Sequence, residues 1–203
     1  MKQSWDMRPV LSSTATINSC VWEQDWGFVV YRAAFSDGDA WERFKETFSN
    51  DDVRVAQKFW RCRFIDEPGL KGKDPAAIKE HHSSLWGDLP SGLQHPLCLV
   101  ATKDVYESFE RYTASYLDTT GAAIAQADPF IKVLYQSHLV DDDMDDGDDP
   151  PVKMFNAGMR ALIDELFPIS IRTEMSFDKV DPGNDDKVWL GVAWEEDIIR
   201  GDS

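Results

Sequence analysis

The stretch Trp26-Gly-Phe-Val-Val-Tyr-Arg-Ala-Ala-Phe35, with the amphipathic pattern that follows it up to Phe48, decides the fold. Apolar side chains occupy both sets of alternating positions, and Arg32 is the only charge inside the run. A strand that is apolar on both faces is typical of the inside of a sheet, not its edge. We therefore predict a central strand over residues 26–35.

A helix is predicted directly after this strand. Ser36 and Asp39 have the spacing of an N-terminal cap, and the aromatic residues Trp41, Phe44 and Phe48 recur three and four positions apart. This spacing puts the three rings on one helix face, which we expect to pack back on the strand.

The rest of the chain alternates between the two kinds of pattern. Strands are predicted at 60–65, 96–101, 130–138, 169–175 and 188–194, and helices at 74–86, 104–121 and 156–168. The order favours an α+β fold: a two-layer sandwich of ferredoxin-like type, with a mainly antiparallel or mixed sheet and helices on one face. A doubly wound sheet is the second choice. No Gly-rich phosphate loop follows a strand, so nucleotide binding at a helix N-terminus has no support.

Length and composition indicate one domain. We assign residues 1–20 to a flexible N-terminal arm and 21–203 to a single α+β domain with an acidic insert at 141–150. A net charge of −16 argues against nucleic acid as a partner, and no run reaches the roughly 18 apolar residues of a membrane span. The three cysteines, Cys20, Cys62 and Cys98, contain no C-x-x-C pair, which suggests free thiols in the cytoplasm. We expect no metal and no cofactor.

The acidic insert has seven aspartates within residues 141–149. Carboxylates bind Ca²⁺ or Mg²⁺, but an EF-hand that began at Asp142 would put Met144 and Lys153 at ligand positions. We expect a solvated loop, which could also fold over a basic surface as a lid.

The motif Trp26-Gly-Phe-Val-Val-Tyr-Arg32 and the later Trp41-Glu-Arg-Phe44 resemble a group of uncharacterised filamentous-fungal proteins. Those proteins share an early W-G-x-V-x-Y-R strand and a W-x-x-F helix. The resemblance implies a fungal source, and it brings no activity, cofactor or catalytic residue.

Polar residues recur at alternate positions of several predicted strands. Assigning each strand's alternation to a face puts the candidate ligand-binding residues on one face: Arg32, Arg61, Arg63, Lys132 and Arg172. His138 falls on the same face and is a candidate catalytic acid or base. A guanidinium group binds carboxylate or phosphate through two parallel hydrogen bonds, so such a face suits an anionic small molecule. The alternative is an ordinary solvated face whose bases pair with nearby acids.

His81 and His82 are adjacent on a predicted helix, so their rings point about 100° apart. No H-x-x-x-H or H-E-x-x-H spacing supports zinc binding. We expect one of the two to be a partly buried, hydrogen-bonded histidine.

Two classes of function follow. One is a cofactor-independent enzyme or binder that acts on an anionic small molecule at the Arg-bearing face. The alternative is a protein–protein interaction module with an acidic surface. A homodimer or another protein partner stays open in either case.

Overall fold

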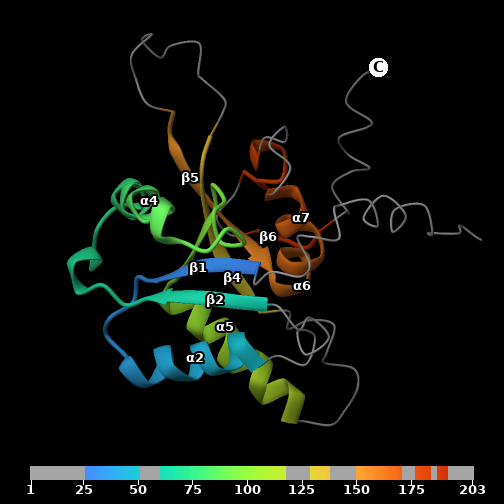
Figure 1. Ribbon diagram of the computed structural model, residues 1–203. Coiled ribbons are helices and arrows are strands. Elements are labelled where there is room, and N and C mark those ends of the chain that lie inside the picture. The colour runs from blue at the N-terminus through green and yellow to red at the C-terminus, as the bar shows by residue number, and fades with distance from the viewer. Residues whose placement is uncertain are drawn as a thin grey trace, which may run out of the picture.

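The computed structural model describes residues 26–50, 60–117, 129–137, 150–170, 177–183 and 187–191. Its strands are β1 (Trp26–Arg32), β2 (Trp60–Ile65), β3 (Cys98–Ala101), β4 (Phe130–Gln136), β5 (Val152–Gly158) and β6 (Val188–Trp189). They form a mixed sheet in the order β2-β1-β3-β4-β5-β6 (Figure 1). The prediction that β1 is a central strand is confirmed, because β1 pairs with both β2 and β3.

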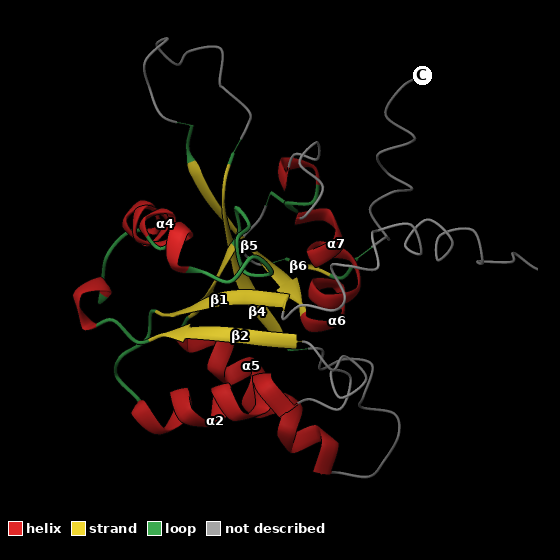
Figure 2. Cartoon of the chain, viewed as in Figure 1, coloured by secondary structure: helices red, strands yellow, loops and turns green. Residues whose placement is uncertain are grey.

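The helices are α2 (Gly38–Asn50), α4 (Pro75–Ser84), α5 (Lys103–Leu117), α6 (Met159–Ala161) and α7 (Phe167–Ser170). A π-helical turn, η4 (Leu162–Leu166), joins α6 to α7, and short 3₁₀ turns occur at η1 (Pro68–Leu70), η2 (Trp86–Asp88) and η5 (Phe177–Lys179). Figure 2 shows the helices in red and the strands in yellow. The predicted cap of α4 is confirmed: the Asp74 carboxylate accepts the Ala77 N–H, and Pro75 holds the first helical position.

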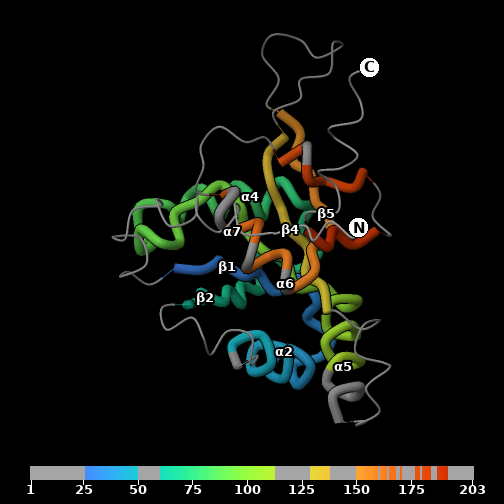
Figure 3. The backbone as a smooth tube through the Cα atoms, turned by 90° about the vertical axis from the view of Figure 1, so that its right-hand side faces the viewer, coloured from blue at the N-terminus to red at the C-terminus, as the bar shows by residue number. Residues whose placement is uncertain are grey.

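The path of the first three strands explains where the helices lie. β1 pairs in parallel with β2 on one side and with β3 on the other. The crossover from β1 through α2 to β2 and the crossover from β2 through α4 to β3 therefore run in opposite directions across the sheet. Parallel crossovers are right-handed, which places the two helices on opposite faces of the sheet. Figure 3 shows α4 and α2 on opposite sides of β1 and β2.

This arrangement corrects the prediction that helices cover one face only. The α+β class with a mixed sheet is shown, but the two-layer ferredoxin-like sandwich is not confirmed. The beginning of the chain instead has the 2-1-3 order of a doubly wound sheet, our second choice, and the antiparallel pairs of β4 complete the mixed sheet.

One face of the sheet, which we call the aromatic face, packs against α2, α5 and the α6–α7 segment. From the sheet it contains Phe28, Val30, Leu99, Ala101, Ile131, Val133, Tyr135, Phe155, Ala157 and Trp189. The predicted stripe of α2 is confirmed here, since Trp41, Phe44 and Phe48 are all buried in this cluster. Trp26 and Phe167 extend it to the α7 end.

The opposite face, which we call the histidine face, lies under α4. From the sheet it contains Val29, Tyr31, Cys98, Val100 and Leu134, and α4 and the loop after it add Ile78, Leu89 and Leu93. This second apolar cluster is smaller, and polar side chains fill the space around it.

Gly27 lies at the closest approach of β1 and β2. A Cβ atom at this position would lie 1.6 Å from the Arg61 carbonyl oxygen, with a positive φ of 154°. Only glycine fits, because any side chain would overlap the backbone of the neighbouring strand.

Three local predictions are wrong. Asn156 does not begin a helix but lies in β5, where strand pairing with β4 outweighs the local helical pattern. Ser170 lies in α7, not in the strand predicted at 169–175, and Pro168 falls inside that helix. There the Phe167 N–H bonds to the Leu162 carbonyl five residues back, so a wider π turn directly precedes the proline.

The cap of α2 also differs from the prediction. Asp37, not Ser36, accepts the N–H of Ala40. Other expectations lie outside the described residues: the arm at 1–20, the insert residues 141–149, Cys20, and the strand ends at 171–175 and 192–194. Cys62 and Cys98 are present as thiols.

Candidate functional site

Strand register decides which of the predicted site residues share a face. Arg63 is the cross-strand partner of Val29, and Lys132 is the partner of Val100, so both lie on the histidine face with Arg61. Arg32 follows Val30 by two residues and therefore lies on the aromatic face. The prediction that Arg32 shares a face with the other bases is wrong, because β1 is apolar on both faces and its pattern does not say which face is which.

Arg32 has a structural position at the end of β1. Its guanidinium donates to the Asp66 carboxylate at 2.9 Å and to the backbone oxygens of Ala34 and Asp37. It also lies 4.9 Å from the centre of the Phe35 ring. These contacts hold the loop between β1 and α2 and use most of its donors.

The other predicted residues do not converge. Lys132 forms an ion pair with Asp104 at 3.0 Å, and Arg61 donates to the Trp60 carbonyl on its own strand. His138 and Arg172 lie outside the described residues. Of the predicted set, Arg63 alone points into a group of polar side chains beneath α4.

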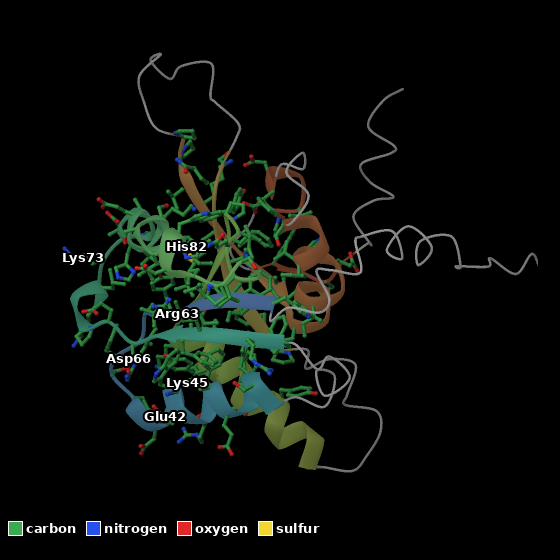
Figure 4. All side chains as sticks on the ribbon, viewed as in Figure 1. Glu42, Lys45, Arg63, Asp66, Lys73 and His82 are labelled. Atoms are coloured by element: carbon green, nitrogen blue, oxygen red, sulfur yellow. The ribbon has the colours of Figure 1, made fainter. Side chains whose placement is uncertain are left out.

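We call this group the basic cluster: Arg63, Lys79, His81, His82 and His95. Arg63 comes from β2, the next three residues come from α4, and His95 comes from the loop that leads to β3. Figure 4 shows Arg63 and His82 on the same side of β1 and β2, the side that α4 covers. Three of the four histidines of the chain gather here.

The buried part of the cluster joins α4 to the loop at 92–97 and to β1. Lys79 donates to the Pro96 carbonyl at 3.0 Å, and His82 Nε2 lies 3.1 Å from the His95 carbonyl oxygen. His95 Nε2 in turn lies 2.6 Å from the Gly27 carbonyl oxygen. Because a carbonyl only accepts, both rings carry their proton on Nε2.

The Nδ1 atoms of His82 and His95 are buried, and neither has a hydrogen-bond partner among the residues that the structure describes. The whole residues are 0% and 3% exposed, and the His95 ring packs between Phe28 and Phe167. The expectation of a hydrogen-bonded, buried histidine on this helix is confirmed for His82.

The outer part of the cluster, the half-buried Arg63 and His81, surrounds the fully buried Tyr31. The Tyr31 hydroxyl lies 3.1 Å from Nδ1 of His81. Arg63 makes a long contact of 3.5 Å to the Asp88 carbonyl at the end of η2 and is close enough to act on the Tyr31 phenol through its charge. Trp86, 40% exposed, lies beside His82 on the same turn.

Burial dominates the electrostatics of this region. It lowers the pKa of His95 to about 4 and lowers the pKa values of His82 and Lys79 below their ordinary values. It also raises the pKa of the Cys98 thiol to about 12. Burial, with a contribution from Cys98, raises the pKa of Tyr31, whereas the charge of Arg63 opposes that shift.

Nowhere in the described parts of the chain does a carboxylate bond to a side chain of the basic cluster. Elsewhere six cations pair with acids: Arg32–Asp66, Arg43–Glu110, Lys45–Glu42, Lys103–Glu107, Lys132–Asp104 and Lys153–Asp178. A basic group without counter-charge is unexpected in a chain of net charge −16.

Sequence reasoning found Arg63 and one buried histidine but missed Lys79, His95 and Tyr31. Lys79 lies next to Ile78 on the buried side of α4. That position was the signal from which the burial of Lys79 could have been predicted. His95 stands in a loop without periodicity, so only the folded chain shows that it meets Gly27.

A second polar group lies at the other end of the sheet. The Asp178 carboxylate is 3% exposed, and its Oδ1 lies 2.6 Å from Ser137 Oγ, 3.1 Å from Tyr135 Oη and 3.1 Å from Lys153 Nζ. Tyr135 also lies 2.8 Å from Asp181. This group contains its own counter-charge and ties the η5 segment to β4 and β5.

No three His, Cys, Asp or Glu side chains among the described residues are grouped so that they could hold a metal ion. Within the same residues, no helix has the length and apolar character to cross a membrane. No protein-family model, curated protein or solved structure matches the chain. The geometry of the basic cluster is therefore the basis for a function.

Proposed function

We propose that the protein binds a small anionic molecule, a carboxylate or phosphate, at the outer part of the basic cluster. Arg63 and His81 are the contacts, and Tyr31 orients the His81 ring. The observation that carries the proposal is that, among the residues that the structure describes, no carboxylate bonds to the basic cluster of a strongly acidic chain. An anion bound there supplies the missing counter-charge.

The chemistry of the two contact residues suits this role. Arg63 presents a planar fork of donors, and its contact to the Asp88 carbonyl is too long to be a strong hydrogen bond. Tyr31 stays protonated because its pKa is raised by burial, so its hydroxyl can donate to His81 Nδ1. When His81 Nδ1 accepts this hydrogen bond, the proton of the neutral ring is on Nε2, which can donate it to an anion.

The proposal revises the predicted site by dropping Arg32, which holds a loop, and Lys132, which is paired. A cytoplasmic location remains part of the proposal. For the interaction module, we expected a large exposed apolar patch. In the described part of the chain, Trp86 and Leu190 are the only large apolar residues that are exposed, which gives no support to that alternative.

Thermal unfolding in the presence of inorganic phosphate or succinate tests the proposal, with chloride at equal ionic strength as the reference. An anion that binds only the folded state stabilises it by about 2.7 kcal/mol at 100 times its Kd. We expect the wild type and Arg43→Gln to gain stability and Arg63→Gln to gain none. Arg43 is a matched control because it lies on α2, on the other side of the sheet, and pairs with Glu110.

Two results would overturn the proposal. If no small anion stabilises the wild type, the anion-binding function is withdrawn in favour of the interaction module. If Arg63→Gln keeps the full stabilisation, the anion binds elsewhere on the chain.

A further inference from the structure

The buried part of the basic cluster supports an inference that does not depend on any bound anion. We propose that His82 and His95 form an acid-sensitive latch that holds α4 and the loop at 92–97 on the sheet, and that protonation of the two rings releases them. The proposal rests on hydrogen-bond geometry at the junction of three segments.

The latch is a short chain of bonds. His82 on α4 donates to the His95 carbonyl, and His95 donates to the Gly27 carbonyl on β1. The Gly27 N–H in turn donates to the Gly92 carbonyl, so both ends of this loop are bonded to the same strand. Breaking the bonds at His82 and His95 removes the chain that runs from α4 through the loop to Gly27, and leaves the Tyr31–His81 and Lys79–Pro96 bonds as polar contacts of α4.

In each ring, the Nδ1 atom makes protonation unfavourable in the folded state. A proton on the Nδ1 atom of His82 or His95 creates a buried N–H donor, for which the described residues offer no acceptor. Burying an unsatisfied polar group, and still more a charge, destabilises the fold, whereas opening the segment lets water solvate both rings.

In the described part of the chain, no carboxylate bonds to either ring. The titratable groups against the His82 ring are Tyr31 on β1 and Lys79 and His81 on α4, whereas the His95 ring faces His82, Phe28 and Phe167. β4 and β5 present Leu134, Val152 and Met154 toward α4, and Lys132 on this face is already paired with Asp104. Two further positive charges would meet only cations and neutral groups.

α4 can move without dismantling the main core, to which the loop at 92–97 contributes Leu97 and contacts from the His95 ring. α4 covers the smaller apolar cluster, whereas most of the buried aromatic residues lie on the aromatic face. Segments with fewer buried apolar contacts open at lower free energy than the rest of a protein. We therefore expect α4 to open before the sheet unfolds.

Amide hydrogen exchange followed by mass spectrometry at pH 7 and pH 4.5, corrected for the intrinsic effect of pH, tests the latch. In the wild type we expect exchange in residues 75–97 to rise at least tenfold at pH 4.5, while residues 130–136 stay protected. The double variant His82→Gln/His95→Gln should lose that rise, because glutamine keeps an Nε2–H donor but does not titrate.

His81→Gln is the control, since it removes a half-buried histidine on the same helix and should keep the acid response. The proposal is wrong if exchange in the wild type rises equally in residues 75–97 and 130–136, or does not rise at all. It is also wrong if the double variant responds to acid as the wild type does. Should the double variant fail to fold, the single variant His82→Gln replaces it, with a reduced rise as the supporting result and an unchanged rise as the contradicting one.

Discussion

The aromatic face and the histidine face of the sheet are both covered by helices, but different side chains fill them. Under α2, α5 and the α6–α7 segment, the sheet meets aromatic rings in edge-to-face contact, such as Trp26 with Trp60 and Phe44 with Phe109. Under α4 it meets Lys79 and His82, which bond to backbone carbonyls, as does His95, whose ring packs between Phe28 and Phe167. On our two proposals, the first face provides stability, and the second responds to ligands and to pH.

Two neighbouring residues of β1 give the largest effect and test this contrast directly. Val29 and Val30 are both fully buried, but Val30 lies on the aromatic face and Val29 lies on the histidine face beside Arg63. We expect Val30→Asp to cost about 4 kcal/mol or more, because its carboxylate is buried among apolar groups. Val29→Asp should destabilise the fold by at least about 1 kcal/mol less, because the charge of Arg63 partly compensates the new carboxylate.

Urea denaturation of both variants measures the difference. Equal losses of stability would mean that Arg63 and its neighbours provide no favourable environment for an anion. In that case the contrast between the two faces would have no electrostatic basis.

The pH dependence of stability gives the next largest effect. Burial holds the pKa of His95 at about 4, against roughly 6.5 in the unfolded chain. Between these values the unfolded chain binds more protons, so the free energy of unfolding must fall as the pH is lowered through this window. The loss from His95 amounts to roughly 3 kcal/mol once the pH reaches 4.

Chemical denaturation at pH 7, 5.5 and 4.5 measures this loss in the wild type and in His95→Gln. The slope of stability against pH should be shallower in the variant. Identical slopes would show that His95 does not titrate differently in the folded and unfolded states.

The sequence predicted the aromatic face better than the histidine face, for a physical reason. The stripe of Trp41, Phe44 and Phe48 has the helical period and meets a strand, so local pattern and tertiary packing agree. The histidine face depends on contacts between distant segments, such as His95 with Gly27, which have no local pattern. Arg32 was placed on the wrong face for a related reason, since a strand that is apolar on both sides does not reveal its orientation.

The same limit applies to the sheet order. The alternation of strands and helices predicted an α+β fold, but β5 was missed because its pairing with β4 is a tertiary contact. The position of α4 follows from the handedness of the crossover once the order β2-β1-β3 is known, and the sequence alone does not give that order.

Lys79 gives the smallest expected effect. This lysine is 8% exposed, yet among the described residues its ammonium has the Pro96 carbonyl as its one hydrogen-bond partner. Replacement of a poorly compensated buried charge by an apolar side chain of similar volume is often close to neutral. We expect Lys79→Met to change the free energy of unfolding by about 1 kcal/mol or less. A loss of more than about 3 kcal/mol in denaturant melts would instead make Lys79 a main support of α4.

Nitrogen-15 NMR of the histidine side chains between pH 7 and pH 4.5, with and without phosphate, tests most directly the claim that the basic cluster has no counter-charge. His82 and His95, assigned from their glutamine variants, should hold the neutral Nε2–H form at pH 5.5. Phosphate should shift the His81 signals in the wild type but not in Arg63→Gln. If His82 and His95 are both protonated at pH 5.5 and phosphate leaves His81 unchanged, a counter-charge is present and the account of this face is wrong.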